Sequence, residues 1–143
     1  KKPISVYCES KTLAHSIEID DLAIVNITFS DGTIGLVEAT NIAYPKNMEG
    51  SITLQCEKGT VKISGEALNE IGYWKGEGKP KKKIGSKIEN IYGENHYEVI
   101  DKIINVLQRK EKPFNTAEES LLAIKVVEKA YESAKKGRRI KLR

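Results

Sequence analysis

The 143-residue sequence is poor in the side chains that most often carry metal or covalent chemistry, with two cysteines and two histidines in all. Cys8 and Cys56 stand in separate apolar runs and lack the C-x-x-C spacing of zinc and redox sites. We therefore expect two buried free thiols, as in a reducing cytoplasm, in preference to a disulfide. His15 and His96 are far apart and belong to no H-E-x-x-H pattern, so no metal site is predicted.

Long apolar runs are also missing. No run approaches the roughly 18 residues that suggest a membrane-spanning helix. The opening KKPISVYCES has neither an initiator methionine nor the apolar segment of a signal peptide. We expect a cytoplasmic protein with no membrane partner, and a piece of a longer chain. With 39% hydrophobic and 31% charged residues, the composition predicts one folded domain over residues 1–143.

Acidic residues are absent from two segments, 79–83 and 135–143, which together carry ten basic side chains. The net charge of +4 therefore arises from two local patches. Lys81 to Lys83, with Tyr73 and Trp74 upstream, have the composition of a nucleic-acid contact, in which lysines neutralise phosphates and aromatic rings stack on bases. A solubilising loop is the favoured interpretation, and nucleic acid is not the expected partner.

Alternation of apolar and polar residues predicts strands through the first half of the chain. The clearest pair, 21–29 and 33–44, is joined by Asp31-Gly32, which supplies the positive backbone angles of a tight hairpin turn. Together these strands form a predicted antiparallel meander. The remaining predicted strands cover residues 4–10, 51–56, 60–65 and 67–75.

Helical spacing replaces this alternation after a loop rich in glycine and lysine, and it predicts helices over 95–110 and 115–137. Thr116 and Glu119 have the spacing of a capping box, and Gly137 suits a left-handed C-terminal cap. The predicted apolar sides of the two helices are Tyr97, Ile100, Ile104 and Leu107 in the first, and Leu121, Leu122, Ile124, Val127, Ala130, Tyr131 and Ala134 in the second.

Strands followed by two helices and by the short basic strand RRIKL (138–142) predict an α+β domain. We expect an open, largely antiparallel sheet with the two C-terminal helices packed on one face and the final strand returning to the sheet. A sheet covered on one side leaves its other face to water or to a partner. We expect that open face to form a homo-oligomer interface.

No catalytic constellation is predicted. The acidic segment 17–21 (IEIDD) is able to ligate a cation, but a solvated start of a strand is the favoured interpretation. Glu94 and His96 flank a predicted helix start, where capping and surface roles outnumber acid–base roles. The one Gly-x-Gly pattern, in KGEGK, neither follows an apolar strand nor opens a helix, so the dinucleotide-binding motif is missing.

Three segments, in this order, resemble the C-terminal domain of the Gfo/Idh/MocA oxidoreductases. They are DDLAIVNITFSDGTIGLVEAT (20–40), EGSITLQCEKGTVKISG (49–65) and HYEVIDKIINVLQRKEKPFNTAEESLLAIKVVEKAYESAKKGRRIKL (96–142). The closing pattern over 130–142 is the most specific match. In 109–113 a lysine replaces the family's usual glycine.

The resemblance implies a longer enzyme. Family members carry an N-terminal Rossmann domain that binds NAD or NADP and supplies a lysine from an E-K-P segment, with an aspartate and a histidine from a D-x-x-x-H segment at the junction. None of these segments occurs here, and neither His15 nor Asp21 lies in a matching motif. We expect the chain to hold no catalytic residue and to bind no cofactor by itself, while the full-length protein uses NAD or NADP with the missing Rossmann domain as partner.

The stretch EATNIAYPKNMEGSITLQ (38–55) is similar to the EATTAAYP stretch of family members that act on nucleotide-linked amino sugars and their uronates. Its polar side chains suit the wall of a sugar pocket, and a plain loop between strands explains them equally well. The candidate substrate-binding residues are Thr40, Asn41, Tyr44, Lys46, Asn47 and His96.

These observations predict the substrate-side and oligomerisation domain of an NAD(P)-dependent oxidoreductase that acts on a sugar or sugar derivative, with a sugar-like small molecule and further copies of the chain as partners. The first alternative is a stand-alone module that binds a small ligand or a protein through the open sheet face. The second is nucleic-acid binding through Lys81 to Lys83.

Overall fold

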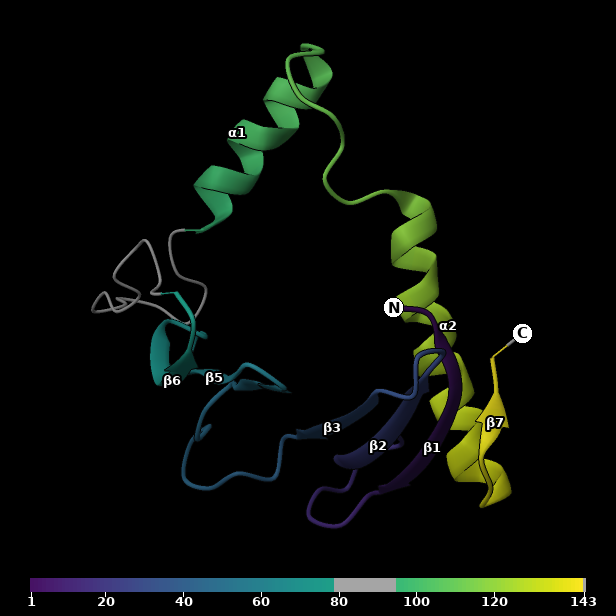
Figure 1. The fold of residues 1–143 in the computed structure, drawn as a ribbon. Coiled ribbons are helices and arrows are strands. Elements are labelled where there is room, and N and C mark those ends of the chain that lie inside the picture. The colour runs from purple at the N-terminus through teal and green to yellow at the C-terminus, as the bar shows by residue number, and fades with distance from the viewer. Residues whose placement is uncertain (79–94, 143) are drawn as a thin grey trace. The chain divides into compact units, whose positions relative to one another are not determined.

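The computed structural model describes residues 1–78 and 95–142 (Figure 1). They belong to two compact units, a first unit of Lys1–Tyr44 with Phe114–Arg143 and a second unit of Pro45–Pro113, and each is described by itself. The lysine cluster 81–83 lies outside the described residues. The elements are β1 (Pro3–Lys11), β2 (Leu22–Phe29), β3 (Ile34–Thr40), β4 (Ile52–Cys56), β5 (Gly59–Ser64), β6 (Glu70–Gly76), α1 (Asn95–Leu107), α2 (Ala117–Lys136) and β7 (Ile140–Lys141).

The first unit contains a four-stranded antiparallel sheet in the order β3-β2-β1-β7. The predicted hairpin between β2 and β3 is confirmed. Gly32 adopts a φ of 84° at its turn, and the Asp31 carboxylate accepts the Thr33 N–H at 3.0 Å. β7 pairs antiparallel with β1, with Ile140 opposite Val6. The final strand therefore joins the sheet, as the sequence predicted.

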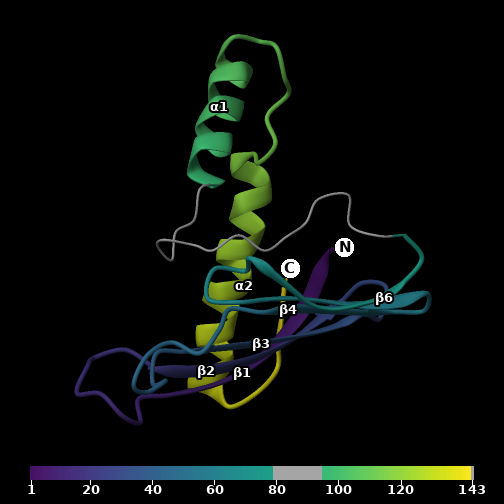
Figure 2. The ribbon, with the colours of Figure 1, turned by 90° about the vertical axis from the view of Figure 1, so that its left-hand side faces the viewer.

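Helix α2 packs against β1 and β7 (Figure 1), and the turned view shows it crossing the strands of this sheet (Figure 2). It begins at the predicted capping box, in which the Thr116 hydroxyl accepts the Glu119 N–H and the Glu119 carboxylate accepts the Thr116 N–H. It ends at Gly137, whose φ is 61°. The unit's core consists of Val6, Cys8, Ala130 and Ile140, with Val25, Ile27, Ala134 and Leu142 packed against it.

The predicted apolar side of α2 is buried only near the helix end. Ala130 and Ala134 contact the core. The core contacts of the helix come from its last turns, so the apolar side chains of its earlier turns are exposed; these are Leu121, Leu122, Ile124 and Val127, and Tyr131 is exposed as well.

The second unit contains a three-stranded antiparallel sheet in the order β4-β5-β6. Gly59 opens β5 opposite Gly76, and a Cβ atom on Gly59 would lie 2.6 Å from the Lys75 carbonyl oxygen, so only glycine fits at this position. Within the described residues the strands thus form two antiparallel sheets instead of the single sheet expected, because regular pairing stops at Thr40 and resumes at Ile52.

Helix α1 also belongs to the second unit. It ends at Leu107, its last predicted apolar residue, and falls short of the predicted end at residue 110, since Arg109 takes a left-handed φ of 59°. The predicted apolar side chains of this helix are exposed; they are Tyr97, Ile100, Ile104 and Leu107. The chain as a whole has the predicted α+β class, with antiparallel sheets, two C-terminal helices and a returning strand.

The two cysteines are free, as predicted, but their burial differs. Cys8 is buried under α2 in the core of the first unit. Cys56 is exposed, so the prediction of a buried thiol is wrong there. It is the last residue of β4, an edge strand whose residues are all exposed.

Candidate functional site

Asp21 is the buried centre of a polar cluster at the base of the loop between β1 and β2. The residue is 3% exposed, and its carboxylate has no exposed surface. One carboxylate oxygen, Oδ1, accepts the Leu13 N–H at 2.8 Å. The other, Oδ2, accepts the N–H groups of Ala14 at 2.8 Å and of His15 at 3.0 Å. The prediction of a solvated acidic segment is therefore wrong for Asp21, because the loop folds its own backbone donors around this carboxylate.

These contacts keep Asp21 ionised and fix the His15 ring. Burial alone raises the pKa of Asp21, but the N–H groups of Ala14, Leu13 and His15, with the His15 ring, outweigh burial and lower the pKa to about 2. Nδ1 of His15 lies 3.2 Å from Oδ2 of Asp21. Because a carboxylate only accepts, we assign the proton to Nδ1, which leaves Nε2 of the neutral ring as an acceptor.

The same residue holds the end of β3. Its carbonyl oxygen accepts the Asn41 N–H at 3.1 Å and the Thr40 hydroxyl at 3.0 Å. The Thr40 hydroxyl in turn accepts the Ile42 N–H at 3.1 Å. These bonds turn the chain out of the sheet, which is why β3 ends at Thr40 and not at Tyr44 as predicted. Thr40 and Asn41, two candidate substrate-binding residues, are thus brought together at Asp21, and Asn41 is exposed.

The other four candidates lie elsewhere. Tyr44, 94% exposed, is the last residue of this part of the first unit. Lys46 and Asn47 follow Pro45, the first residue of the second unit. The Lys46 ammonium lies 3.3 Å from the Glu66 carboxylate, and both groups are exposed. His96 is an exposed residue in the first turn of α1. Thr40 and Asn41, which are neighbours in the sequence, both bind the Asp21 carbonyl oxygen. Tyr44 belongs to the same unit, and the remaining three candidates belong to the second unit.

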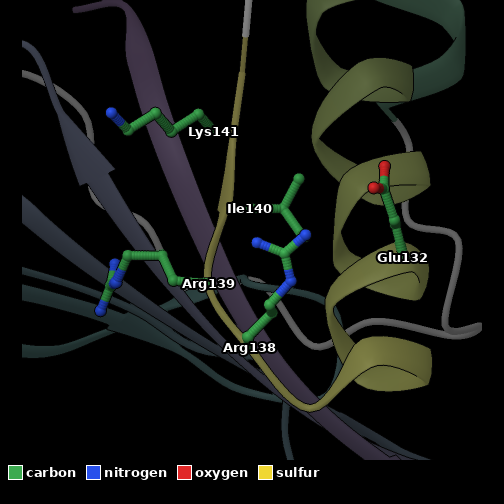
Figure 3. A pocket seen from close by; sticks show the side chains of 5 residues that line it. All are labelled: Glu132, Arg138, Arg139, Ile140 and Lys141. Atoms are coloured by element: carbon green, nitrogen blue, oxygen red, sulfur yellow. The ribbon is translucent and has the colours of Figure 1, made fainter.

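A groove lies at the C-terminal end of the first unit, with a volume of about 300 Å³ (Figure 3). Arg138 and Ile140 point toward α2, whereas Arg139 and Lys141 point to the other side of the strand (Figure 3). The cationic groups therefore do not converge on one point as they would around a bound anion. The lining residues are Glu132, Arg138, Arg139, Ile140 and Lys141.

Neighbouring groups already bind two of the charged side chains in this groove. The Lys129 and Lys136 ammonium groups, each 2.7 Å from the Glu132 carboxylate, lower its pKa to about 2 against the opposing effect of burial. The Arg139 guanidinium donates to the Thr28 hydroxyl at 2.9 Å and to the Ser5 hydroxyl at 3.3 Å. We assign the groove a structural role, in which these contacts attach the final strand.

Within residues 1–78 and 95–142, no three side chains of histidine, cysteine, aspartate or glutamate are grouped as metal ligands. The Asp21 oxygens accept backbone N–H groups instead. No described helix has the length and apolar character needed to cross a membrane.

The fold matches a known family. The profile described as "Oxidoreductase family, C-terminal alpha/beta domain", of the Gfo/Idh/MocA group, matches residues 3–142. The chain belongs to this family, and the resemblance found in the sequence is confirmed. A search among curated proteins gave no match.

Solved structures of two WlbA dehydrogenases, each in complex with NADH and UDP-GlcNAcA, are similar to the chain at 32% sequence identity. The Chromobacterium violaceum protein matches over 99% of this chain and 41% of its own, with a TM-score of 0.84. The Bordetella pertussis protein matches over 99% of this chain and 39% of its own, with a TM-score of 0.80. A levoglucosan dehydrogenase in complex with NADH, at 16% identity, shows the shared fold, with 99% and 45% coverage and a TM-score of 0.78. The chain spans about 40% of the length of the WlbA proteins.

Proposed function

We propose that the chain is the substrate-side domain of an NAD(P)-dependent oxidoreductase whose substrate is a nucleotide-linked amino sugar or its uronate. The observation that carries this proposal is the 32% identity over 99% of the chain to two dehydrogenases solved with NADH and UDP-GlcNAcA. In this proposal an N-terminal Rossmann domain of the same polypeptide binds the nicotinamide and supplies the catalytic groups. The present chain forms one wall of the sugar-binding site.

The candidate residues suit a ligand that is rich in hydroxyl groups and negatively charged. Asn41, exposed beside Asp21, offers an amide that both donates and accepts. Tyr44 offers an exposed ring and hydroxyl, and Lys46 offers an ammonium group to a carboxylate or phosphate. The Thr40 hydroxyl, already bonded to backbone, acts by holding Asn41 in place. Asn47 and His96 complete the proposed set.

Oligomerisation through the open sheet face is the second part of the proposal. Register places Ile24, Ile34 and Leu36 on the face opposite the core residues Val25 and Ile27. All three apolar side chains of this opposite face are exposed in the chain alone. A second copy that covers them would remove apolar surface from water. Leu36→Asp in the full-length protein should shift its sedimentation toward smaller species, and an unchanged profile would contradict this part.

The test of the activity uses the full-length gene product that contains this chain. Its incubation with UDP-GlcNAcA and NAD⁺, or NADP⁺, should produce absorbance of the reduced nicotinamide, whereas levoglucosan in place of the sugar nucleotide should not. Failure to bind either nicotinamide would overturn the dehydrogenase assignment. Turnover of levoglucosan alone would retain that assignment and overturn the substrate class. Location in the cytoplasm stays a prediction.

A further inference from the structure

The loop between β1 and β2, residues 12–21, has a defined shape that the proposed function does not use. The Thr12 hydroxyl donates to the Ile19 carbonyl at 2.7 Å, which closes the loop across its base. The backbone N–H groups of three successive residues, 13–15, point at the Asp21 carboxylate. Four hydrogen bonds therefore hold this loop internally, before the His15 side chain is considered.

Asp21 also connects this loop to the candidate substrate segment. Its carboxylate binds residues 13–15, and its carbonyl binds Thr40 and Asn41. His15 and Asn41 are therefore held by the same residue at the same end of the four-stranded sheet. Both lie in the first unit, whose sheet fixes this arrangement.

The His15 ring adds a group suited to sugar recognition. Its Nδ1–H is directed at the buried Asp21 carboxylate, while 46% of the side chain is exposed. The carboxylate already has three backbone donors, so the bond to the ring adds little to loop closure and instead sets the orientation and tautomer of the imidazole. The result is an imidazole whose Nε2 is an oriented acceptor at the end of the sheet where Asn41 binds the same aspartate. Sugar hydroxyl groups are donors for such an acceptor.

We propose that His15 is a substrate-binding residue, with its Nε2 atom accepting a hydrogen bond from a hydroxyl group of the sugar, and that Asp21 is the positioning residue that orients it. This inference rests on the proposed function and extends its binding site to the β1–β2 loop. His15 takes no part in hydride transfer in this proposal.

The test measures binding of UDP-GlcNAcA to the full-length protein saturated with NADH, by isothermal titration calorimetry. His15→Ala should weaken binding about five- to tenfold, the effect of one lost hydrogen bond. His15→Gln, whose side-chain oxygen can take the place of Nε2, should restore most of the affinity. NADH affinity and kcat at saturating substrate should stay at wild-type values, so that the change appears in KM. Glu18→Gln, an exposed change in the same loop, is the matched control and should bind as wild type does.

The positioning role of Asp21 is tested with a double variant, which measures the coupling between Asp21 and His15 in substrate binding. Asp21→Asn should reduce affinity as His15→Ala does, and the double variant should be no weaker than the worse single variant, because the two residues act as one unit. Additive losses would overturn the positioning role. His15→Ala keeps the test decisive if Asp21→Asn fails to fold, since the His15 side chain is half exposed.

The two proposals fail in different ways. Wild-type affinity of His15→Ala for UDP-GlcNAcA would overturn this inference and leave the proposed function standing. A wild-type protein that binds NADH but not UDP-GlcNAcA would overturn the proposed substrate class, and this inference with it.

Discussion

Strands β1 and β4 carry nearly the same pattern, SVYC and TLQC, but their side chains differ in burial. Val6 and Cys8 in β1 are 0% and 4% exposed, whereas Leu54 in β4 is 59% exposed and Cys56 is exposed as well. β1 lies between two strands and under α2, while β4 is an edge strand that pairs with β5. Alternation thus predicts a strand, and burial depends on what packs over it.

The largest expected difference between the two strands is in thiol chemistry. Cys56 should react with N-ethylmaleimide in the folded chain, and Cys8 only after unfolding, because Cys8 is out of reach and burial raises the pKa of its thiol. Intact mass after brief labelling should show one added group in buffer and two in urea. Two groups on the folded chain would contradict the burial of β1.

Shortening the apolar side chain at the equivalent positions of β1 and β4 should lower the stability of the chain by different amounts. Val6→Ala should lower the free energy of unfolding by about 2.5 kcal/mol, because it leaves a cavity under α2. Leu54→Ala, at an exposed site, should change it by less than about 0.5 kcal/mol. Urea denaturation of the chain, followed by circular dichroism, measures both. Equal losses would mean that Leu54 is as well packed as Val6.

Ser133 attaches α2 to β1 and to the start of the final strand. Its buried hydroxyl accepts the Cys8 N–H at 3.0 Å and donates to the Arg138 carbonyl at 2.7 Å. Ser133→Ala leaves both backbone groups without this partner and should cost about 2 kcal/mol. Ser120→Ala, on the same helix with a 3.3 Å side-chain contact to Asn115, is the matched control and should cost less than about 0.5 kcal/mol. A similar loss in both variants would contradict the special role of the buried hydroxyl, because alanine has a higher helix propensity than serine and propensity cannot cause a loss in either variant.

Lowering the pH should have the smallest of these effects on stability, and it should act through Asp21 at the loop end of β1. The pKa of Asp21 is lower in the folded chain than in the unfolded chain, so its contribution to stability is fully present above the unfolded value and is lost as pH falls through the folded value. Stability should therefore decline between about pH 4 and about pH 2. Asp21→Asn should flatten the dependence of the urea midpoint on pH in that window. Glu132, with a pKa lowered to about 2 by Lys129 and Lys136, contributes in the same window, so some dependence should remain.

The candidate site shows how far sequence reasoning extends. Thr40 and Asn41, which are neighbours in the sequence, were selected from a family resemblance, and both bind the Asp21 carbonyl oxygen. Asp21 and His15 were set aside because neither lies in a matching family motif, and the acidic segment that ends at Asp21 was interpreted as a solvated start of a strand. The sequence did contain one signal for this cluster. Asp21 directly follows a polar loop, and an aspartate in that position can accept hydrogen bonds from the N–H groups of the loop. Nothing in the sequence indicates that the same residue also binds the end of β3, nineteen positions away.

The features that the sequence determined by itself depend on neighbours a few residues apart. The Asp31-Gly32 turn, the Thr116 and Glu119 capping box and the Gly137 cap are such features, because backbone angles and short-range hydrogen bonds select them. Together with strand alternation and helical spacing they were sufficient for the α+β class and for the returning strand.

The tertiary structure alone decided which of these elements are covered. Cys8 is buried because α2 packs over β1, where the Cys8 N–H donates to Ser133, 125 positions later, while Cys56 has the same local pattern and is exposed. The binding of the Asp21 carbonyl to the end of β3, the division into two sheets and the exposed early turns of α2 follow in the same way. Each depends on surfaces brought together by residues distant in the chain, and local periodicity carries no information about which surfaces will meet.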